Sequence, residues 1–368
     1  MNSHLLVSIK QIQKKDYPIY LGKKFQEWWI QIIKKRNYSK HFMITDKNVY
    51  NIYKSFLERF QQDLNTKKII ILNPGEDNKH IKKTYPIYEE LIKNNIDRKS
   101  VIIAFGGGVI GDFSGFIAST ILRGVHFIQI PTTLLSMVDA SIGGKVAVNV
   151  NLGKNMVGCF FQPEMVFCNM DFLKTLPEKE WICGLAEIIK HSLLNRKVYI
   201  SLKKEIIKEP NYKNWKEEVW QKVIYDSITV KAKIVSKDEK EANLRSVLNL
   251  GHTVGHAIES LTNYKKFSHG ETVSRGLITA LLISKKKLNF PEKEFKDIIN
   301  LMTLLNLPLN TARFSAKEIW EHLQYDKKNQ YNKVKYILLK KIGSPVYNID
   351  LHWNEFESAW KEQKELFG

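Results

Sequence analysis

The stretch Ser100-Val-Ile-Ile-Ala-Phe-Gly-Gly-Gly-Val-Ile-Gly-Asp112 decides the fold of the first half of this 368-residue chain. Its first six residues form an apolar run that predicts a buried β-strand. The glycines follow directly, and Phe113–Thr120 then has the pattern of a helix. Gly106, Gly108 and Gly111 satisfy the GxGxxG spacing, which lets backbone N–H groups and a helix N-terminus approach a pyrophosphate.

Taken alone, this glycine motif leaves two interpretations open. The usual dinucleotide fingerprint lies at the first strand and is followed about 20 residues later by an acidic residue that holds a ribose. Here the motif lies about 100 residues into the chain, and no such acidic residue follows. A tight turn that requires small residues is therefore the alternative to a phosphate-binding loop.

The elements predicted around the motif indicate an α/β fold in the first half and helices in the second. Strands are expected over His41–Thr45, Lys68–Leu72, Ser100–Phe105 and His126–Ile130, with helices over Asn48–Asn65 and Ile81–Asn95. Beyond Asp171 the expected elements are helices over Glu178–Asn195, Trp215–Ser236, His252–Leu261, Glu271–Lys287, Glu292–Leu305 and Trp353–Leu366, and a strand over Lys333–Leu339. We therefore predict two domains: a mostly parallel α/β domain over residues 1–175 and a mostly helical domain over residues 176–368.

The composition is that of an ordinary globular protein, with 43% hydrophobic and 26% charged residues. We expect no membrane span, because Asp112, Arg123, Asp139 and Lys145 interrupt the most apolar region. The first ten residues lack the apolar core of a secretory signal. Three cysteines without a CxxC pair favour a reducing compartment. A cytoplasmic location is the prediction.

The net charge of +19 allows three interpretations. Nucleic-acid binding requires basic residues clustered on one face. A field that steers a polyanionic small substrate is a second reason for excess charge. The third is lysines scattered over solvated helix faces. Here the lysines occur in scattered pairs such as Lys14-Lys15 and Lys340-Lys341. We favour the third interpretation with some substrate steering, and expect no nucleic-acid partner.

The segment Asn249-Leu-Gly-His-Thr-Val-Gly-His-Ala-Ile-Glu259 indicates a metal site. Positions i and i+4 share one face of a helix, so His252 and His256 can point into one pocket. Adding one carboxylate from elsewhere produces a ligand set that suits zinc with an open coordination position. A third histidine follows in His269-Gly-Glu271. An enzyme is therefore the leading interpretation.

Charged residues in apolar or glycine-rich context supply the remaining candidates. Lys145 follows two glycines, and Lys154 and Asn155 follow a third, which suits a phosphate because cations and amides can converge on its oxygens. Glu187 lies in an apolar helical stretch and shares a face with Lys190 and with the following histidine. An intrahelical ion pair is the alternative explanation for that glutamate.

Taken together, these motifs resemble the 3-dehydroquinate synthase family of sugar-phosphate cyclases. The resemblance runs in family order over nearly the whole chain and rests on residues 106–112 (GGGVIGD), 123–145 (RGVHFIQIPTTLLSMVDASIGGK), 153–163 (GKNMVGCFFQP), 184–191 (GLAEIIKH), 241–259 (EANLRSVLNLGHTVGHAIE), 269–271 (HGE) and 326–328 (DKK). It implies a Rossmann-like NAD-binding domain, a helical domain, an active site in the cleft between them, and a homodimer.

The same resemblance implies roles for individual residues. Glu187, His252 and His269 become the ligands of a zinc or cobalt ion, whereas His256 becomes a substrate contact or proton shuttle and His191 a supporting residue. NAD contacts fall on Asp46, Asn48, Glu76, Lys79, Gly107, Gly108, Val109, Asp112, Thr132, Thr133, Asp139, Lys154, Phe172 and Thr175. Substrate contacts fall on Lys145, Asn155, Lys190, Lys231, Arg245, Asn249, His256, Lys328 (rather than Lys327) and, reaching the neighbouring subunit, Arg123.

The sequence departs from the family pattern at four positions in three places. Val146-Ala147 replaces the more common Thr-Gly after Lys145, Ala140 replaces a serine, and Lys179 stands where the family has a glutamine. The first two could alter a cofactor hydrogen bond, but neither removes a group that the chemistry needs. We omit Lys179 from the predicted contacts.

The implied reaction converts 3-deoxy-D-arabino-heptulosonate 7-phosphate to 3-dehydroquinate and phosphate, with transient oxidation by NAD and no net redox change. One alternative is another sugar-phosphate cyclase, but Lys231 and Arg245 are needed as a pair only if the substrate carries a carboxylate. A metal-dependent polyol dehydrogenase is a second alternative, and it would not need Lys145, Asn155 and Lys328. A nucleic-acid binder would have basic patches interleaved with aromatic residues and no metal constellation.

Overall fold

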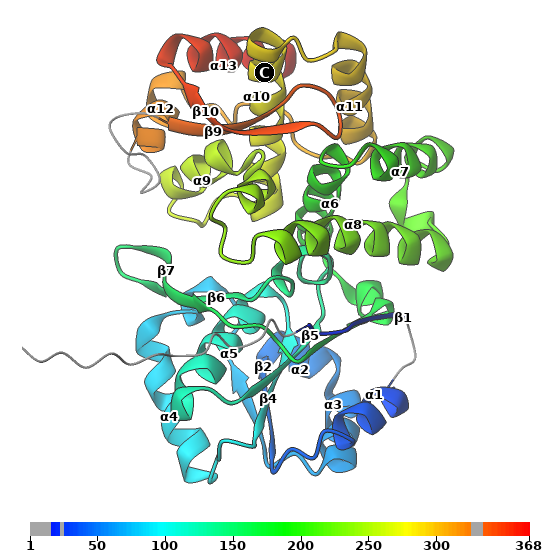
Figure 1. The fold of residues 1–368 in the computed structure, drawn as a ribbon, viewed down its shortest axis with the longest axis vertical. Helices are drawn as coiled ribbons and strands as arrows, with labels where there is room; N and C mark the ends of the chain where they lie inside the picture. Colours follow the sequence, from blue (N-terminus) through cyan, green and yellow to red (C-terminus); the bar gives the residue numbers. More distant parts are fainter. Residues whose placement is uncertain (1–15, 23–25, 325–333) are drawn as a thin grey trace, which may run out of the picture.

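The first half of the chain is built on one parallel sheet, as seen in a computed structural model that describes residues 16–22, 26–324 and 334–368 (Figure 1). Six strands pair in the order β1-β8-β5-β4-β2-β3, and each neighbouring pair is parallel. The strands are β1 (Ile19–Gly22), β2 (His41–Asp46), β3 (Lys68–Leu72), β4 (Val101–Gly106), β5 (His126–Pro131) and β8 (Met165–Asn169). The predicted α/β class is confirmed.

Helices cover both faces of this sheet because its strands bury side chains on both sides. One layer consists of α1 (Gln26–Lys34) and α3 (Lys54–Leu64), and the other of α4 (Thr84–Lys93) and α5 (Gly108–Thr120). Successive strand residues point to opposite faces: Met43 packs with the first layer, and Phe42 packs with the second. Both side chains are fully buried, and each contributes about 1.5–3 kcal/mol of hydrophobic stabilisation.

The second half packs helices on the carboxyl edge of the sheet (Figure 1). Its elements are α6 (Glu178–Leu193), α7 (Arg196–Lys208), α8 (Glu217–Lys237), α9 (His252–Leu261), α10 (His269–Leu288), α11 (Glu292–Leu304), α12 (Ala316–Gln324) and α13 (Trp353–Phe367), with the antiparallel pair β9 (Val334–Leu339) and β10 (Pro345–Leu351). The first half adds α2 (Lys47–Ile52) and the antiparallel hairpin β6 (Lys145–Val150) and β7 (Gly153–Phe160). Short helical turns are η1 (Glu76–Asn78), η2 (Ile81–Lys83), η3 (Ile121–Arg123), η4 (Ser136–Ala140), η5 (Met170–Thr175), η6 (Tyr212–Asn214) and η7 (Leu244–Asn249).

Several elements differ from the sequence prediction. The helix expected over Asn48–Asn65 is two helices that meet at Tyr53, whose hydroxyl donates to the carbonyl of Phe172 at 3.2 Å. The helix expected from Phe113 begins at Gly108, directly after the glycine turn. Within the described ranges, no helix has the length and apolar character that a membrane crossing requires. The domain division after residue 175 stays a prediction.

Candidate functional site

The site begins where the chain connections diverge at the carboxyl ends of β2 and β4. The chain leaves β2 toward β3 and leaves β4 toward β5, on opposite sides. Open α/β sheets bind ligands in the crevice at such a switch point. Asp46 ends β2, and its Oδ1 caps α2 by accepting from the backbone nitrogens of Asn48 at 2.9 Å and Val49 at 3.0 Å. Gly108 begins α5 directly after β4.

A cavity of about 300 Å³ lies at these strand ends. Many of the residues predicted to contact NAD line it: Asp46, Asn48, Gly107, Gly108, Val109, Thr132, Thr133, Phe172 and Thr175. Tyr53 also lines it, although the sequence analysis did not select this residue.

A larger cavity of about 640 Å³ adjoins the first, and Gly75, Gly108, Val109, Thr133 and Glu180 line both. The remaining predicted NAD contacts line the larger cavity: Glu76, Lys79, Asp112, Asp139 and Lys154. So do the predicted substrate and metal residues Lys145, Asn155, Lys190, Lys231, Arg245, Asn249, His252, His256 and His269. The cavity therefore lies between the sheet's carboxyl edge and helices α6, α8, α9 and α10.

Among the described residues, the predicted site residues Glu187 and Arg123 line neither cavity. Arg123 is exposed on η3. It follows Leu122 on a left-handed turn, with φ of 67° and 51° at the two residues. Lys328 and its neighbour Lys327 lie outside the described residues.

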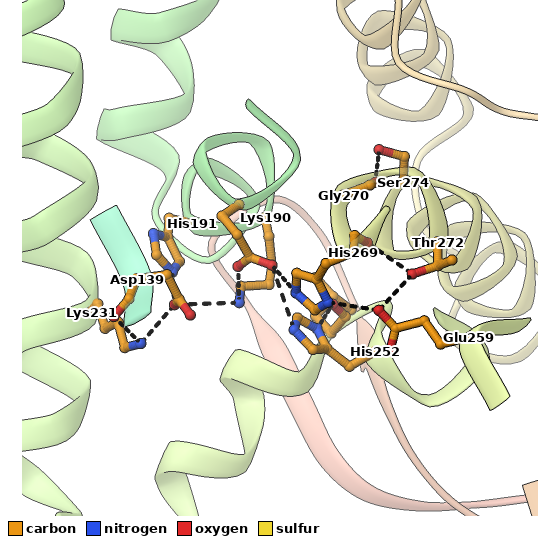
Figure 2. A network of polar contacts seen from close by, with 12 residues as sticks. Asp139, Lys190, His191, Lys231, His252, Glu259, His269, Gly270, Thr272 and Ser274 are labelled. Atoms are coloured by element: carbon orange, nitrogen blue, oxygen red, sulfur yellow. Dashed lines mark hydrogen bonds and ion pairs between the residues drawn. The ribbon is translucent and has the colours of Figure 1, made fainter. Parts of the chain in front are cut away.

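Glu187, His252 and His269 form a group that could hold a metal ion. Figure 2 shows the two histidines of this group close together. Glu187 comes from the middle of α6, while His252 and His269 are the first residues of α9 and α10. Glu187 Oε1 lies 3.5 Å from His252 Nε2 and 3.3 Å from His269 Nε2. The ring of His256 lies against that of His252, with centroids 5.4 Å apart.

This group fits a divalent ion. Glu187 is fully buried; its Oε2 forms an ion pair with Lys190, and its Oε1 faces the Nε2 atoms of both histidines. The second ring nitrogens are engaged elsewhere: His252 Nδ1 lies 3.3 Å from the Leu250 oxygen, and His269 Nδ1 lies 3.1 Å from Glu259 Oε1. Each Nε2 therefore faces Glu187. Two imidazoles and one carboxylate are the donors of many catalytic zinc sites.

The charges of the group follow from burial and from its neighbours. Burial alone would raise the pKa of Glu187, but Lys190 and His252 hold it well below its usual range. Burial and Lys190 hold the pKa of His252 well below its usual range. Burial also lowers the pKa of His269, but hydrogen bonds to Glu187 and Glu259 more than offset this and raise it to about 10.

Glycines let the helices that carry these ligands pack closely. A Cβ at Gly276 of α10 would lie 1.9 Å from the Gly251 carbonyl oxygen, just before α9. A Cβ at Gly270 would lie 2.4 Å from the Cα of Cys183 on α6. Helix α10 therefore contacts the backbone of both neighbours, which brings the three ligands together.

A second network surrounds Asp139 at the end of η4 (Figure 2). Lys231 Nζ donates to both the Oδ1 and the backbone oxygen of Asp139 at 2.7 Å, and Lys190 Nζ lies 3.9 Å from Oδ1. His191 Nε2 lies 3.4 Å from the same oxygen, and its Nδ1 lies 2.7 Å from Ser227 Oγ. Burial would raise the pKa of Asp139, but Lys231 and Lys190 hold it well below its usual range.

Further contacts link the two sides of the cavity. Lys145 on β6 forms an ion pair with Glu241, which also accepts a hydrogen bond from Asn249 Nδ2 at 2.6 Å. Lys79 is buried, pairs with Asp112 and donates to Asn155 Oδ1 at 2.5 Å. The sequence analysis selected neither Glu241 nor Glu259, because their role depends on contacts between distant segments.

Comparison with known proteins relates both sequence and fold to other enzymes. Residues 69–183 match the family model described as 3-dehydroquinate synthase N-terminal, and residues 184–329 match the C-terminal one. A 3-dehydroquinate synthase of Leptospira interrogans is 46% identical over 356 residues, covering 96% of this chain and 97% of that protein.

Two solved structures share the fold. One is 2-epi-5-epi-valiolone synthase of Streptomyces hygroscopicus subsp. jinggangensis 5008 with NAD+ and Zn2+ bound, with a TM-score of 0.87 and 20% identity over 98% of this chain and 100% of that one. The other is 2-deoxy-scyllo-inosose synthase complexed with carbaglucose-6-phosphate, NAD+ and Co2+, with a TM-score of 0.80 and 24% identity over 94% and 96%.

Proposed function

The chain belongs to the 3-dehydroquinate synthase family, and from this premise we propose that it converts 3-deoxy-D-arabino-heptulosonate 7-phosphate to 3-dehydroquinate and phosphate, a step of the shikimate pathway. The observation that carries the proposal is the cavity of about 640 Å³, whose lining includes both histidines of the two-histidine, one-carboxylate group and the buried cations Lys190, Lys231 and Arg245. Because phosphate leaves by elimination of a C–O bond, the enzyme would be a lyase, and because the reaction has no net redox change, it would recycle its cofactor.

We assign NAD to the smaller cavity and to the wall that it shares with the larger one. NAD supplies a reversible hydride acceptor when bound. The backbone at Gly107 and Gly108 opens α5 and suits a pyrophosphate, and the Asp46 carboxylate at the end of β2 suits a ribose hydroxyl. Val109 and Thr133 line both cavities, so cofactor and substrate would border the same residues.

We assign the metal to Glu187, His252 and His269. These residues would hold a zinc or cobalt ion, which would supply Lewis-acid chemistry to a substrate hydroxyl. The chain prepares the group beforehand: Leu250 and Glu259 engage Nδ1 of the two histidines, which leaves both Nε2 atoms for the ion.

The remaining polar residues suit a substrate that carries both a phosphate and a carboxylate. Lys145, Asn155 and His256 serve the phosphate, where His256 can hold a proton, and Lys328 is the fourth predicted contact. Lys231 and Arg245 serve the carboxylate. Arg245 is 2% exposed, and among the described residues its Nε has no hydrogen-bond partner, so a buried donor is available for an anion. This favours 3-dehydroquinate synthase over a cyclase with an uncharged sugar end.

We also propose a cytoplasmic homodimer in which Arg123 reaches the neighbouring subunit's phosphate site. Arg123 precedes Gly124, where a Cβ would lie 3.9 Å from the ring of Phe161, the residue that follows β7. Met156, Val157 and Phe160 of the neighbouring strand β7 are 39–40% exposed, so this strand carries apolar side chains that a second subunit would cover. Cys159, Cys168 and Cys183 form no disulfide, which agrees with a reducing compartment.

The test is a phosphate-release assay with zinc and catalytic NAD. We expect phosphate from the heptulosonate phosphate without accumulation of NADH. Net NADH would instead indicate a polyol dehydrogenase, and activity that survives metal removal would contradict the assigned metal role. A heptulose phosphate without the carboxylate should turn over poorly, whereas equal turnover would indicate a different sugar-phosphate cyclase.

A further inference from the structure

The Nδ1 atoms of the two histidines in the metal group have different partners, and Figure 2 shows the contact between His269 and Glu259. His252 Nδ1 faces a neutral backbone oxygen, that of Leu250, at 3.3 Å. His269 Nδ1 faces a carboxylate oxygen, Glu259 Oε1, at 3.1 Å. The family resemblance assigned no role to Glu259, although this residue also lines the larger cavity.

Glu259 lies in the last turn of α9 and is 8% exposed. The hydroxyl of Thr272 on α10 lies 3.4 Å from Glu259 Oε1 and 2.8 Å from the backbone oxygen of His269. Two groups of α10 therefore face one carboxylate oxygen.

A plain structural role for Glu259 would be to tie α9 to α10. These helices already touch through their backbones, because a Cβ at Gly276 would lie 1.9 Å from the Gly251 oxygen. A buried carboxylate is costly unless it is paired and hydrogen-bonded, so it is a poor choice for a contact that backbone packing already makes. A carboxylate behind a ligating imidazole has a different use: it fixes the tautomer and the ring orientation, and it makes the ring a more basic ligand.

We propose that Glu259 is a positioning residue of the metal site, whose carboxylate accepts the Nδ1–H of His269 and directs Nε2 of that ring toward the ion. The inference rests on the proposed function, because it concerns the ion assigned to Glu187, His252 and His269. It also divides the two histidines: His269 is held by a charged acceptor, and His252 by a neutral one.

The test measures metal affinity in Glu259→Gln and Glu259→Ala. Glutamine retains an acceptor oxygen but removes the charge, so Zn2+ affinity in a chelator-competition assay should fall about 10-fold; alanine removes both, and the fall should approach 100-fold. The visible absorption spectrum of the Co2+-loaded protein should change in Glu259→Ala, because the orientation of one ligand is lost.

A matched control separates positioning from general destabilisation. Gln363 is a fully buried amide that also contacts α10, bonding to Thr279 Oγ1 at 2.6 Å and to the Arg275 oxygen at 3.1 Å. Gln363→Ala should lower the melting temperature and leave Zn2+ affinity within about twofold of the unmodified protein.

Two results would overturn the inference: Zn2+ affinity within twofold of the unmodified protein in both Glu259 variants, or an equal loss in Gln363→Ala. If the unmodified protein itself binds no Zn2+, the proposed function fails instead, so the two failures are distinguishable.

Discussion

The two walls of the cleft hold their polar groups by different means. On the α/β wall, Asp46 and Gly108 lie where strands end and helices begin, so backbone geometry positions them. On the helical wall, Glu187, Lys190 and Arg245 project from or beside helices and are at most 2% exposed. Their charges persist there because each lies beside an oppositely charged or polar partner.

This difference predicts how the walls respond to substitution. Polar groups at strand ends contact the backbone locally, so one can be changed with little effect on the others. Buried charges form one network, and removal of one leaves its partners uncompensated. We therefore expect small, separable effects on the first wall and large, coupled effects on the second.

The largest effect should come from the metal group. His269→Ala removes a proposed ligand and should abolish zinc binding and lower phosphate release by at least about 100-fold. His256→Ala should keep the metal but turn over slowly. Metal content and phosphate release measured on both variants decide this, and equal metal loss in both would restore His252 and His256 as the ligand pair.

A smaller but coupled effect should follow Lys231→Met, which keeps the side-chain length and removes the charge beside Asp139. The loss of this partner should cost about 3 kcal/mol of unfolding free energy and lower turnover as well. Lys233→Met, at an exposed position of the same helix, is the control and should change stability by less than about 0.5 kcal/mol. Urea denaturation measures both, and similar losses would remove the contrast between buried and exposed charge.

On the other wall, Asp46→Ala should cost only about 1 kcal/mol, because it removes the N-cap of α2. The KM for NAD should rise, while turnover at saturating NAD stays close to that of the unmodified protein. Asp46→Asn can still cap the helix, so it should retain stability and still weaken NAD binding. If turnover at saturating NAD collapses in either variant, the polar groups of the α/β wall depend on one another as strongly as those of the helical wall.

The smallest effect should come from Asp97, at the opposite end of the sheet. Hydrogen bonds from Ser39 and Lys40 hold the pKa of this carboxyl at about 2. Because its pKa in the unfolded chain is about 3.9, the stabilisation is present above that pH and is lost as the pH falls toward 2. For so exposed a group it should be under about 1 kcal/mol. Asp97→Asn should lose stability at pH 6 but match the parent near pH 2; no difference at pH 6 would refute this.

The same contrast explains how much could be predicted from the sequence. The strand expected over Ser100–Phe105 is β4, shifted by one residue. It could be predicted because a long apolar run followed by glycines is typical of a buried strand that ends in a tight turn. The strand β8 was missed, since five buried residues do not distinguish a strand from a helix. The break at Tyr53 was missed as well, because amphipathic periodicity continues across it.

At the site, local spacing placed His252 and His256 in one pocket, and both line the larger cavity. The choice of ligands came from family resemblance. The helix that was expected from Glu271 begins at His269, and the Ser268–Glu271 capping box was a local signal that could have located its start. The contacts of Glu241 and Glu259 had no local signal, because they depend on how loops and helices pack in three dimensions.

The contact between Gly276 and Gly251 has a consequence for metal preference. His252 begins α9 and His269 begins α10, and the distance between these two helices is set by a contact between their backbones. The distance between the two ligating Nε2 atoms therefore depends mainly on the spacing of the helices, and a change of side-chain rotamer can adjust it only slightly. Attempts to retune the enzyme for a larger or smaller ion should begin with that interhelical contact and leave the coordinating side chains in place.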